Sequence, residues 1–166
     1  MKILVTGGAG FIGSNISDAL IDDKHAITII DNLSTGKKEN IPAKAEFHEI
    51  DISSPVVDKI FERGKFDIVF HLAAQMDVRK SVENPINDAE INILGGVNLL
   101  QASVKHKVRK IVFSSTGGAI YGEQDYFPAD EKHEANPVSP YGISKLAFEK
   151  YLYFYRVQHG LEYVAL

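Results

Sequence analysis

Short apolar runs rich in β-branched residues alternate along this chain with longer stretches of helical periodicity. Most of these runs are continuously apolar, which is typical of parallel strands covered on both faces. The alternation favours an α/β fold, a doubly wound parallel sheet with right-handed crossovers and helices on both faces. The expected strands are Lys2–Thr6, Ala26–Asp31, Ala45–Asp51, Phe66–Ala73, Arg109–Ser115 and Glu162–Leu166, and the expected helices are Gly13–Asp22, Ser54–Arg63, Pro85–Lys107 and Pro140–Gln158.

Length and composition restrict the classes of protein this chain can belong to. Its 166 residues predict one domain over 1–166, and the link Asn32–Lys44 is expected to be a loop with at most a short helix. A net charge of −4 argues against a nucleic-acid binder. The absence of cysteine and the scatter of the six histidines argue against a metal site. Neither a membrane span nor a signal peptide is evident, so we expect a cytoplasmic protein with no membrane partner.

Two expected helices are apolar on more than one side. Within Pro85–Lys107, the stripe containing Ile86 and Leu100 is accompanied by a second apolar set that includes Leu94, and aromatic residues surround the axis of Pro140–Gln158. Both helices could present broad core-facing stripes. Alternatively, helices 85–107 and 140–158 could pack against a second copy to form a homodimer.

A glycine-rich turn follows the first expected strand. Gly7, Gly10 and Gly13 form a G-x-x-G-x-x-G spacing immediately before the first helix. Without side chains, the backbone can turn tightly and approach a diphosphate, and the helix N-terminus offers unpaired N–H groups to it. A purely structural turn would give the same glycines, but the strand–turn–helix context favours a dinucleotide site of the Rossmann type.

Acidic residues end the second and third expected strands. Asp31 lies 18 residues after Gly13, close to the ~20 expected for the acid that binds the adenosine ribose. A carboxylate there accepts hydrogen bonds from ribose hydroxyls and repels a 2′-phosphate, which favours NAD over its phosphorylated form. Asp51 and Ile52 are weaker candidates, for the adenine amino group and the adenine ring.

A tyrosine and a lysine four residues apart begin the last expected helix. Tyr141 and Lys145 therefore share one helix face, and an ammonium beside a phenol favours the phenolate, lowering its pKa. The fifth strand ends in hydroxyl residues, including Ser114 and Thr116, which can orient a substrate hydroxyl. Each feature alone is common, but together at the carboxyl ends of parallel strands they indicate an active site.

The chain resembles the extended short-chain dehydrogenases/reductases, and among them the UDP-glucose 4-epimerase family. The motifs that carry the resemblance are Thr-Gly-Gly-Ala-Gly-Phe-Ile-Gly at 6–13, Asp-Asn-Leu-Ser at 31–34, His-Leu-Ala-Ala at 71–74, Phe-Ser-Ser-Thr at 113–116, Tyr-Gly at 121–122 and Pro-Tyr-Gly-Ile-Ser-Lys-Leu-Ala at 140–147. The resemblance covers the whole chain.

This resemblance implies NAD as the cofactor, a UDP-sugar as the substrate and epimerisation at C4 through a transient 4-keto sugar. It implies the catalytic residues Thr116, Tyr141 and Lys145. With the glycine turn, the expected cofactor site comprises Gly7, Gly10, Phe11, Ile12, Gly13, Asp31, Asn32, Leu33, Ser34, Thr35, Gly36, Asp51, Ile52, Leu72, Ala73, Ala74, Gln75, Asn92, Ser114, Tyr141 and Lys145.

Departures from the family pattern keep alternatives open. Gly117 and Gly118 stand where related dehydratases carry an acid, which favours epimerisation over a 4,6-dehydratase or a reductase. Gln75 and Met76 replace a lysine found in some epimerases. The chain ends inside its last expected strand, before the substrate domain implied by the resemblance. We therefore expect a portion of a longer enzyme, with an inactive NAD-binding fragment as the third alternative.

Overall fold

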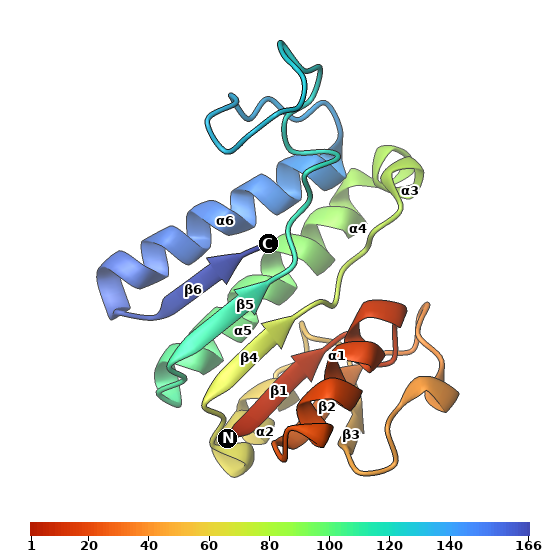
Figure 1. Cartoon of the computed structure of the whole chain (residues 1–166), viewed down its shortest axis with the longest axis vertical. Coiled ribbons are helices and arrows are strands. Elements are labelled where there is room, and N and C mark those ends of the chain that lie inside the picture. Colours follow the sequence, from red (N-terminus) through yellow and green to blue (C-terminus); the bar gives the residue numbers. More distant parts are fainter.

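The computed structural model describes all residues, 1–166, as one parallel sheet with flanking helices (Figure 1). The six strands lie in the order β3-β2-β1-β4-β5-β6, and every neighbouring pair is parallel. This is the doubly wound arrangement that the alternation of runs predicts. The strands are β1 (Lys2–Thr6), β2 (Ala26–Asp31), β3 (Glu46–Glu49), β4 (Ile68–His71), β5 (Lys110–Phe113) and β6 (Glu162–Ala165).

Helices connect the strands and cover the sheet unequally. The α-helices are α1 (Phe11–Asp22), α2 (Val56–Gly64), α3 (Val78–Glu83), α4 (Pro85–Ala89), α5 (Gly96–Lys105) and α6 (Pro140–His159), with a short 3₁₀ turn η1 (Lys38–Asn40) and a π-helical segment η2 (Glu90–Gly95). On one face α1 packs over β1 and β2, whereas α2, α5 and α6 pack side by side on the other (Figure 1). None of these helices combines the length and apolarity needed to cross a bilayer.

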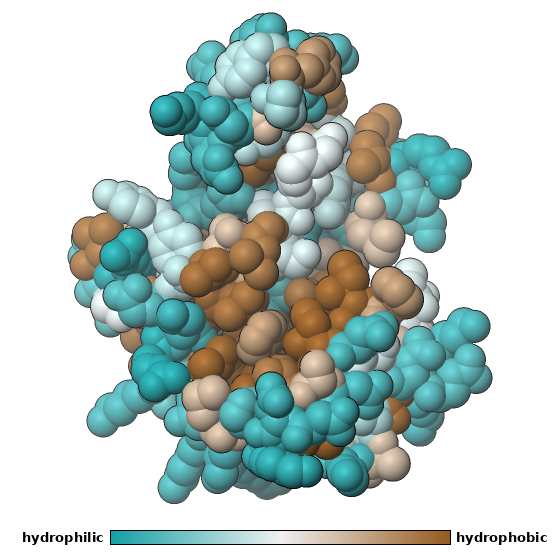
Figure 2. Space-filling model, in the orientation of Figure 1, coloured by the Kyte–Doolittle hydropathy of each residue, from teal (hydrophilic) through white to brown (hydrophobic).

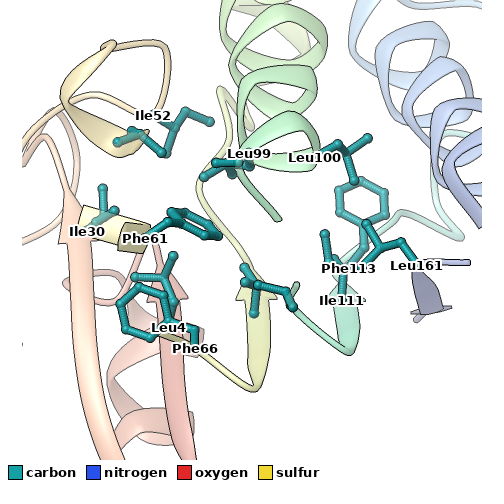
Figure 3. Close-up of a cluster of buried hydrophobic side chains, with 14 of the residues drawn as sticks. Leu4, Ile30, Ile52, Phe61, Phe66, Leu99, Leu100, Ile111, Phe113 and Leu161 are labelled. Carbon is teal, nitrogen blue, oxygen red and sulfur yellow. The ribbon is translucent and has the colours of Figure 1, made fainter. Parts of the chain in front are cut away.

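The larger hydrophobic core lies between the sheet and α2, α5 and α6 (Figure 3). Leu4 and Ile30 extend from the strands toward Phe61 and Leu99 on the helices, and a smaller core forms beneath α1. Figure 2 shows hydrophobic side chains gathered over the middle of the α1 face, where β4, β5 and β6 lie without a helix above them. The two faces of the sheet therefore differ in how completely their apolar residues are buried.

The structure corrects the expected helix over 85–107. The helical segment starts at Pro85 as predicted, but it passes through the π-helical segment η2 and ends at Lys105. A π segment widens the turn, so residues before and after it no longer share one stripe. Ile86, expected in the core stripe, is 73% exposed, and Leu94 is 62% exposed. The core-facing interpretation therefore fails for part of this helix.

The structure contains a further helix, α3, that the sequence pattern does not predict. Asp77 caps it by accepting hydrogen bonds from the backbone N–H groups of Arg79 and Lys80. At six residues the helix is too short to produce a visible period, and its capping aspartate was its one local signal. The link Asn32–Lys44, expected to be a loop with at most a short helix, contains the 3₁₀ turn η1.

Candidate functional site

The glycine turn is built by backbone-to-backbone contact. Gly7 has φ +73°, and a Cβ there would lie 2.6 Å from the backbone nitrogen of Ala73. A Cβ on Gly13 would lie 2.2 Å from the carbonyl oxygen of Gly7, so α1 can meet the turn only if residue 13 is glycine. At Gly10 the nearest atom to such a Cβ is 3.3 Å away. The two outer glycines are therefore required by packing, while the middle one leaves space above the turn.

The N-terminus of α1 opens into that space. No side chain caps it, and its first turn carries no acidic residue. Phe11 is 84% exposed and Ile12 is also exposed. Because the first N–H groups of a helix have no intrahelical acceptor and carry a partial positive charge, this end suits an anionic group such as a diphosphate.

Asp31 is buried at the end of β2, next to the turn. One carboxylate oxygen accepts a hydrogen bond from the Ala9 N–H at 2.9 Å, and the other accepts one from the Leu33 N–H at 2.8 Å. Gly36 packs against both Ala9 and Asp31, so the loop after β2 folds back over the turn. The remaining lone pairs of the carboxylate can accept further hydrogen bonds, as the ribose assignment requires.

The ends of β2 and β3 are joined by a second carboxylate. Asn32 donates to Asp51 at 2.8 Å, and the Ser53 backbone and hydroxyl donate to its other oxygen. Burial raises the pKa of Asp51, but these hydrogen bonds outweigh burial and hold its pKa below the ordinary value. Ile52 lies in the larger core and is only 4% exposed, so its contact with an adenine ring stays a prediction.

The segment after β4 lies against the glycine turn. The Thr6 hydroxyl accepts hydrogen bonds from the N–H groups of Leu72 and Ala73 and shares a third, at 2.8 Å, with Nδ1 of His71. His71 is buried, and burial together with the charge of Lys145 lowers its pKa to about 3. It is thus a neutral, hydrogen-bonded core histidine.

Two hydrogen bonds join the side chain of Asn92 to the backbone of Gln75. The Asn92 side chain accepts from the Gln75 N–H and donates to the Gln75 carbonyl, both at 2.9 Å. Asn92 lies in η2, so the π-helical segment holds the strand-end loop in place. Both residues were expected in the cofactor site, and the structure shows that the Asn92 amide is committed to positioning the backbone of Gln75.

Tyr141 and Lys145 lie on one face of α6, at the carboxyl edge of the sheet. Ser139 caps the helix by accepting from the Gly142 N–H, and the Tyr141 N–H donates to the Ser81 hydroxyl at 3.2 Å. The Lys145 ammonium donates to the Ser114 carbonyl at 2.9 Å and lies 4.7 Å from the Phe113 ring centre and 5.7 Å from that of Tyr141. The end of β5 and the residue after it thus lie against the first two turns of α6.

The pKa of Tyr141 differs from the expectation that its lysine neighbour lowers it. Burial raises this pKa above its ordinary value, the Thr116 hydroxyl opposes that rise, and the charge of Asp88 adds to it. Burial lowers the pKa of Lys145 to about 8, with Asp88 acting in the opposite direction. The ammonium faces the rings of Phe113 and Tyr141 and the Ser114 carbonyl, and desolvation is the larger effect on the phenol.

Three buried residues of this region were not predicted: Ser81, Asp88 and Ser144. Ser81 contacts the first turn of α6, and Asp88 accepts a hydrogen bond from Ser144 on that helix. Of the three, only Asp88 had a sequence signal, because it is a charged residue between the apolar positions 86 and 89 of the expected helix. Nothing in the sequence marked Ser81 or Ser144.

Taken together, a parallel sheet with a glycine turn, a strand-end acid and a Tyr–Lys pair defines a dinucleotide-binding domain of the short-chain dehydrogenase/reductase class. The model of the NAD dependent epimerase/dehydratase family matches residues 3–166, and the chain belongs to that family. Two features of this structure fit a dinucleotide. The glycine turn leaves space above Gly10, and Asp31 provides a buried hydrogen-bond acceptor beside it.

Relatives and solved structures agree with this family. The chain is 51% identical over 164 residues to a putative UDP-glucose 4-epimerase of Methanocaldococcus jannaschii, covering 99% of this chain and 54% of that protein. The UDP-glucose 4-epimerase of Thermotoga maritima, solved with UDP-glucose, superimposes with a TM-score of 0.98 at 48% identity, with 99% of this chain and 54% of that one covered. The Thermus thermophilus UDP-glucose 4-epimerase, solved with NAD, gives 0.96 at 46% identity, covering 99% and 54%. The chain spans about half the length of the curated relatives it matches.

Proposed function

We propose that this chain is the NAD-binding part of a UDP-sugar 4-epimerase and carries its catalytic residues. The observation that carries the proposal is the meeting of Tyr141, Lys145 and the end of β5 at the same sheet edge as the glycine turn. Relatives with the same sheet and close sequence are named UDP-glucose 4-epimerases, one of them solved with UDP-glucose and another with NAD.

The cofactor would lie along the carboxyl edge of the sheet. The N–H groups at the start of α1 would hold the diphosphate, Asp31 would accept from the adenosine ribose, and Lys145 would bond the nicotinamide ribose. When bound, NAD would accept a hydride from the sugar carbon and return it to the opposite face, and its cationic ring would favour the Tyr141 phenolate.

The chain's own residues would move the proton and orient the sugar. Tyr141, as phenolate, would take the proton of the sugar 4-hydroxyl and return it after the transient 4-keto sugar has turned over. Thr116 would hold that hydroxyl in line, since its own hydroxyl lies beside the phenol and lowers the phenol's pKa. Lys145 would supply the nearby positive charge. Gly117 and Gly118 offer no acid to remove a ring proton, which favours epimerisation over a dehydratase or reductase reaction.

Replacing Tyr141 with Phe tests the assignment. Interconversion of UDP-glucose and UDP-galactose, followed by NMR, should fall by about 10³-fold while NAD affinity changes little. Unchanged turnover would overturn the role of Tyr141. The same assay separates the alternatives, because an epimerase consumes no added reductant and accumulates no keto sugar. A chain that binds NAD and turns over no UDP-sugar would support the inactive NAD-binding fragment.

We also propose a homodimer through the helices at 85–107 and 140–158. Their outer sides expose apolar side chains, among them Leu94, Tyr153, Phe154 and Val157. Burying these patches against a second copy would remove them from water. Sedimentation velocity should show a dimer that Leu94→Asp dissociates. A monomer at all concentrations would overturn the proposal.

A further inference from the structure

A buried carboxylate lies behind the Tyr–Lys pair. Asp88 of α4 is 0% exposed, and both of its oxygens accept hydrogen bonds. One accepts from the Ser144 hydroxyl at 2.6 Å, and the other from the side-chain amides of Asn92 and Gln75, each at 3.0 Å. The three donors come from α6, from η2 and from the loop after β4. One side chain of α4 thus connects α6, η2 and the loop after β4 at the proposed catalytic end.

The hydrogen-bond partners of Asp88 suit a carboxylate. All three groups can donate and both carboxylate oxygens accept, which is the pattern of the ionised, acceptor-only form. The carboxylate nevertheless forms no ion pair. A buried charge without an ion pair is costly, so a fold that keeps one here needs a compensating reason.

That reason lies on α6. Ser144 occupies the position directly before Lys145, and both side chains are buried. The Lys145 ammonium has the Ser114 carbonyl as its hydrogen-bond acceptor, and its burial lowers its pKa to about 8 while the charge of Asp88 acts to raise it. The same charge raises the pKa of Tyr141. Asp88 therefore acts on both members of the pair without touching either in the hydrogen-bond network.

We propose that Asp88 is a positioning residue that orients Ser144, Asn92 and Gln75 around the Tyr141–Lys145 pair and supplies the negative charge that offsets the buried ammonium. This inference rests on the roles proposed above for Tyr141 and Lys145. It goes beyond them, because it assigns the charge balance of the site to a residue outside the catalytic trio.

The other ionisable groups near Asp88 and Lys145 cannot substitute for it. His71 of β4 faces Lys145 but is neutral, with its pKa lowered to about 3. Asp77, in the loop, pairs with the exposed Arg79. The remaining charged residues on α3 and at the start of η2 are Lys80, Glu83 and Glu90, and all are exposed. Glu149, one turn after Lys145 on α6, is only partly buried and accepts a hydrogen bond from the Ser115 hydroxyl. Asp88 is the fully buried carboxylate, and its charge is the one that raises the pKa of Lys145.

The test is the titration of Lys145 itself, which needs no catalytic activity. In the chain with ¹³C-labelled lysine, the Cε shift of Lys145, assigned through Lys145→Arg, should titrate near pH 8. In Asp88→Asn the midpoint should fall by about one pH unit, because burial then acts without an opposing charge. In Ser144→Ala, which removes a hydrogen bond but keeps the carboxylate, the midpoint should stay within about 0.3 of the parent value.

An unchanged midpoint in folded Asp88→Asn would overturn the proposal, whatever the activity of the enzyme. A loss of turnover in Tyr141→Phe with the predicted lysine shift supports both proposals. Turnover that is unaffected by Tyr141→Phe, together with the predicted shift, removes the catalytic assignment and leaves the charge balance intact.

A second variant covers the case in which Asp88→Asn does not fold. If the carboxylate offsets the ammonium, removing both charges should be less damaging than removing the carboxylate alone. The double variant Asp88→Asn/Lys145→Met should therefore fold where Asp88→Asn does not, and where both fold its thermal midpoint should exceed that of Asp88→Asn by several degrees. A double variant less stable than Asp88→Asn would contradict the proposed offset.

Discussion

The two ends of the proposed NAD site are built in different ways. The glycine turn and Asp31 form a cradle of backbone groups, and the carboxylate bonds residues no more than 22 positions away along the chain. The Tyr141–Lys145 end is held by buried side chains from distant segments, such as Asp88 with Ser144, 56 positions apart, and Ser81 with Tyr141, 60 positions apart. Substitutions at the first end should therefore reduce stability and NAD binding by disturbing the shape of the backbone. Substitutions at the second end should act by removing hydrogen bonds or by changing the balance of charge.

The largest effect should come from crowding the cradle. In Gly13→Ala the added Cβ would lie 2.2 Å from the Gly7 carbonyl oxygen, and neither backbone can give way without moving α1. We expect a loss of more than about 4 kcal/mol in the free energy of unfolding and no detectable NAD binding. Urea unfolding and calorimetric titration measure the two quantities.

Gly10→Ala is the matched control, since its Cβ meets nothing closer than 3.3 Å. Its stability should stay within about 1 kcal/mol of the parent. Equal destabilisation by both substitutions would show that the close approach at Gly13 is not what requires a glycine there.

Acid should act on the catalytic end through His71, which stacks on Phe113 beneath Lys145. Its pKa is about 3 in the folded chain and ~6.5 when unfolded, so the unfolded state binds the extra proton first. The stability from the neutral ring is complete above about pH 6.5 and is lost as pH falls toward 3, by roughly 5 kcal/mol in total.

Chemical unfolding at a series of pH values measures this dependence, and His71→Asn should abolish most of the slope between pH 6 and 4. Asp51, at the cradle end, has a lowered pKa, so its stabilising contribution begins to fall only below its unfolded value of 3.8. A slope that survives in His71→Asn would assign the acid sensitivity elsewhere.

A smaller effect is expected when the cradle keeps its shape and loses only a charge. Asp31→Asn leaves one acceptor where two backbone N–H groups now bond, and it removes the charge that repels a 2′-phosphate. NAD affinity should fall about tenfold and discrimination against NADP should narrow, with a stability cost of ~2 kcal/mol. Calorimetric titration of both dinucleotides measures this, and the exposed Asp22→Asn is the charge-matched control.

The smallest effect should come from removing the hydrogen bond between Ser81 of α3 and the first turn of α6. Ser81→Ala removes the acceptor of the partly buried Tyr141 N–H, which costs about 1 kcal/mol. NAD affinity should change less than twofold, because Ser81 contacts only the catalytic end. Thermal unfolding and calorimetry report both, and a large loss of NAD affinity would show that the two ends are not separable.

This difference also explains how much the sequence alone could predict. The doubly wound parallel sheet, the glycine turn and the placement of Tyr141 and Lys145 follow from local spacing combined with the rule that parallel strands expose their carboxyl ends on one edge. The π-helical segment, Ser81, Asp88 and Ser144 do not, because their roles depend on contacts across the fold that leave no period in the chain. The raised pKa of Tyr141 was missed for the same reason, since burial was not visible beforehand.

A crystal structure of the chain grown with NAD tests most directly whether the two ends form one site. The account predicts a diphosphate against the backbone N–H groups of Gly10, Phe11 and Ile12, a ribose on Asp31 and a pyridine ring facing the Tyr141 hydroxyl. A dinucleotide bound away from the start of α1, or a ring turned from that hydroxyl, would contradict it.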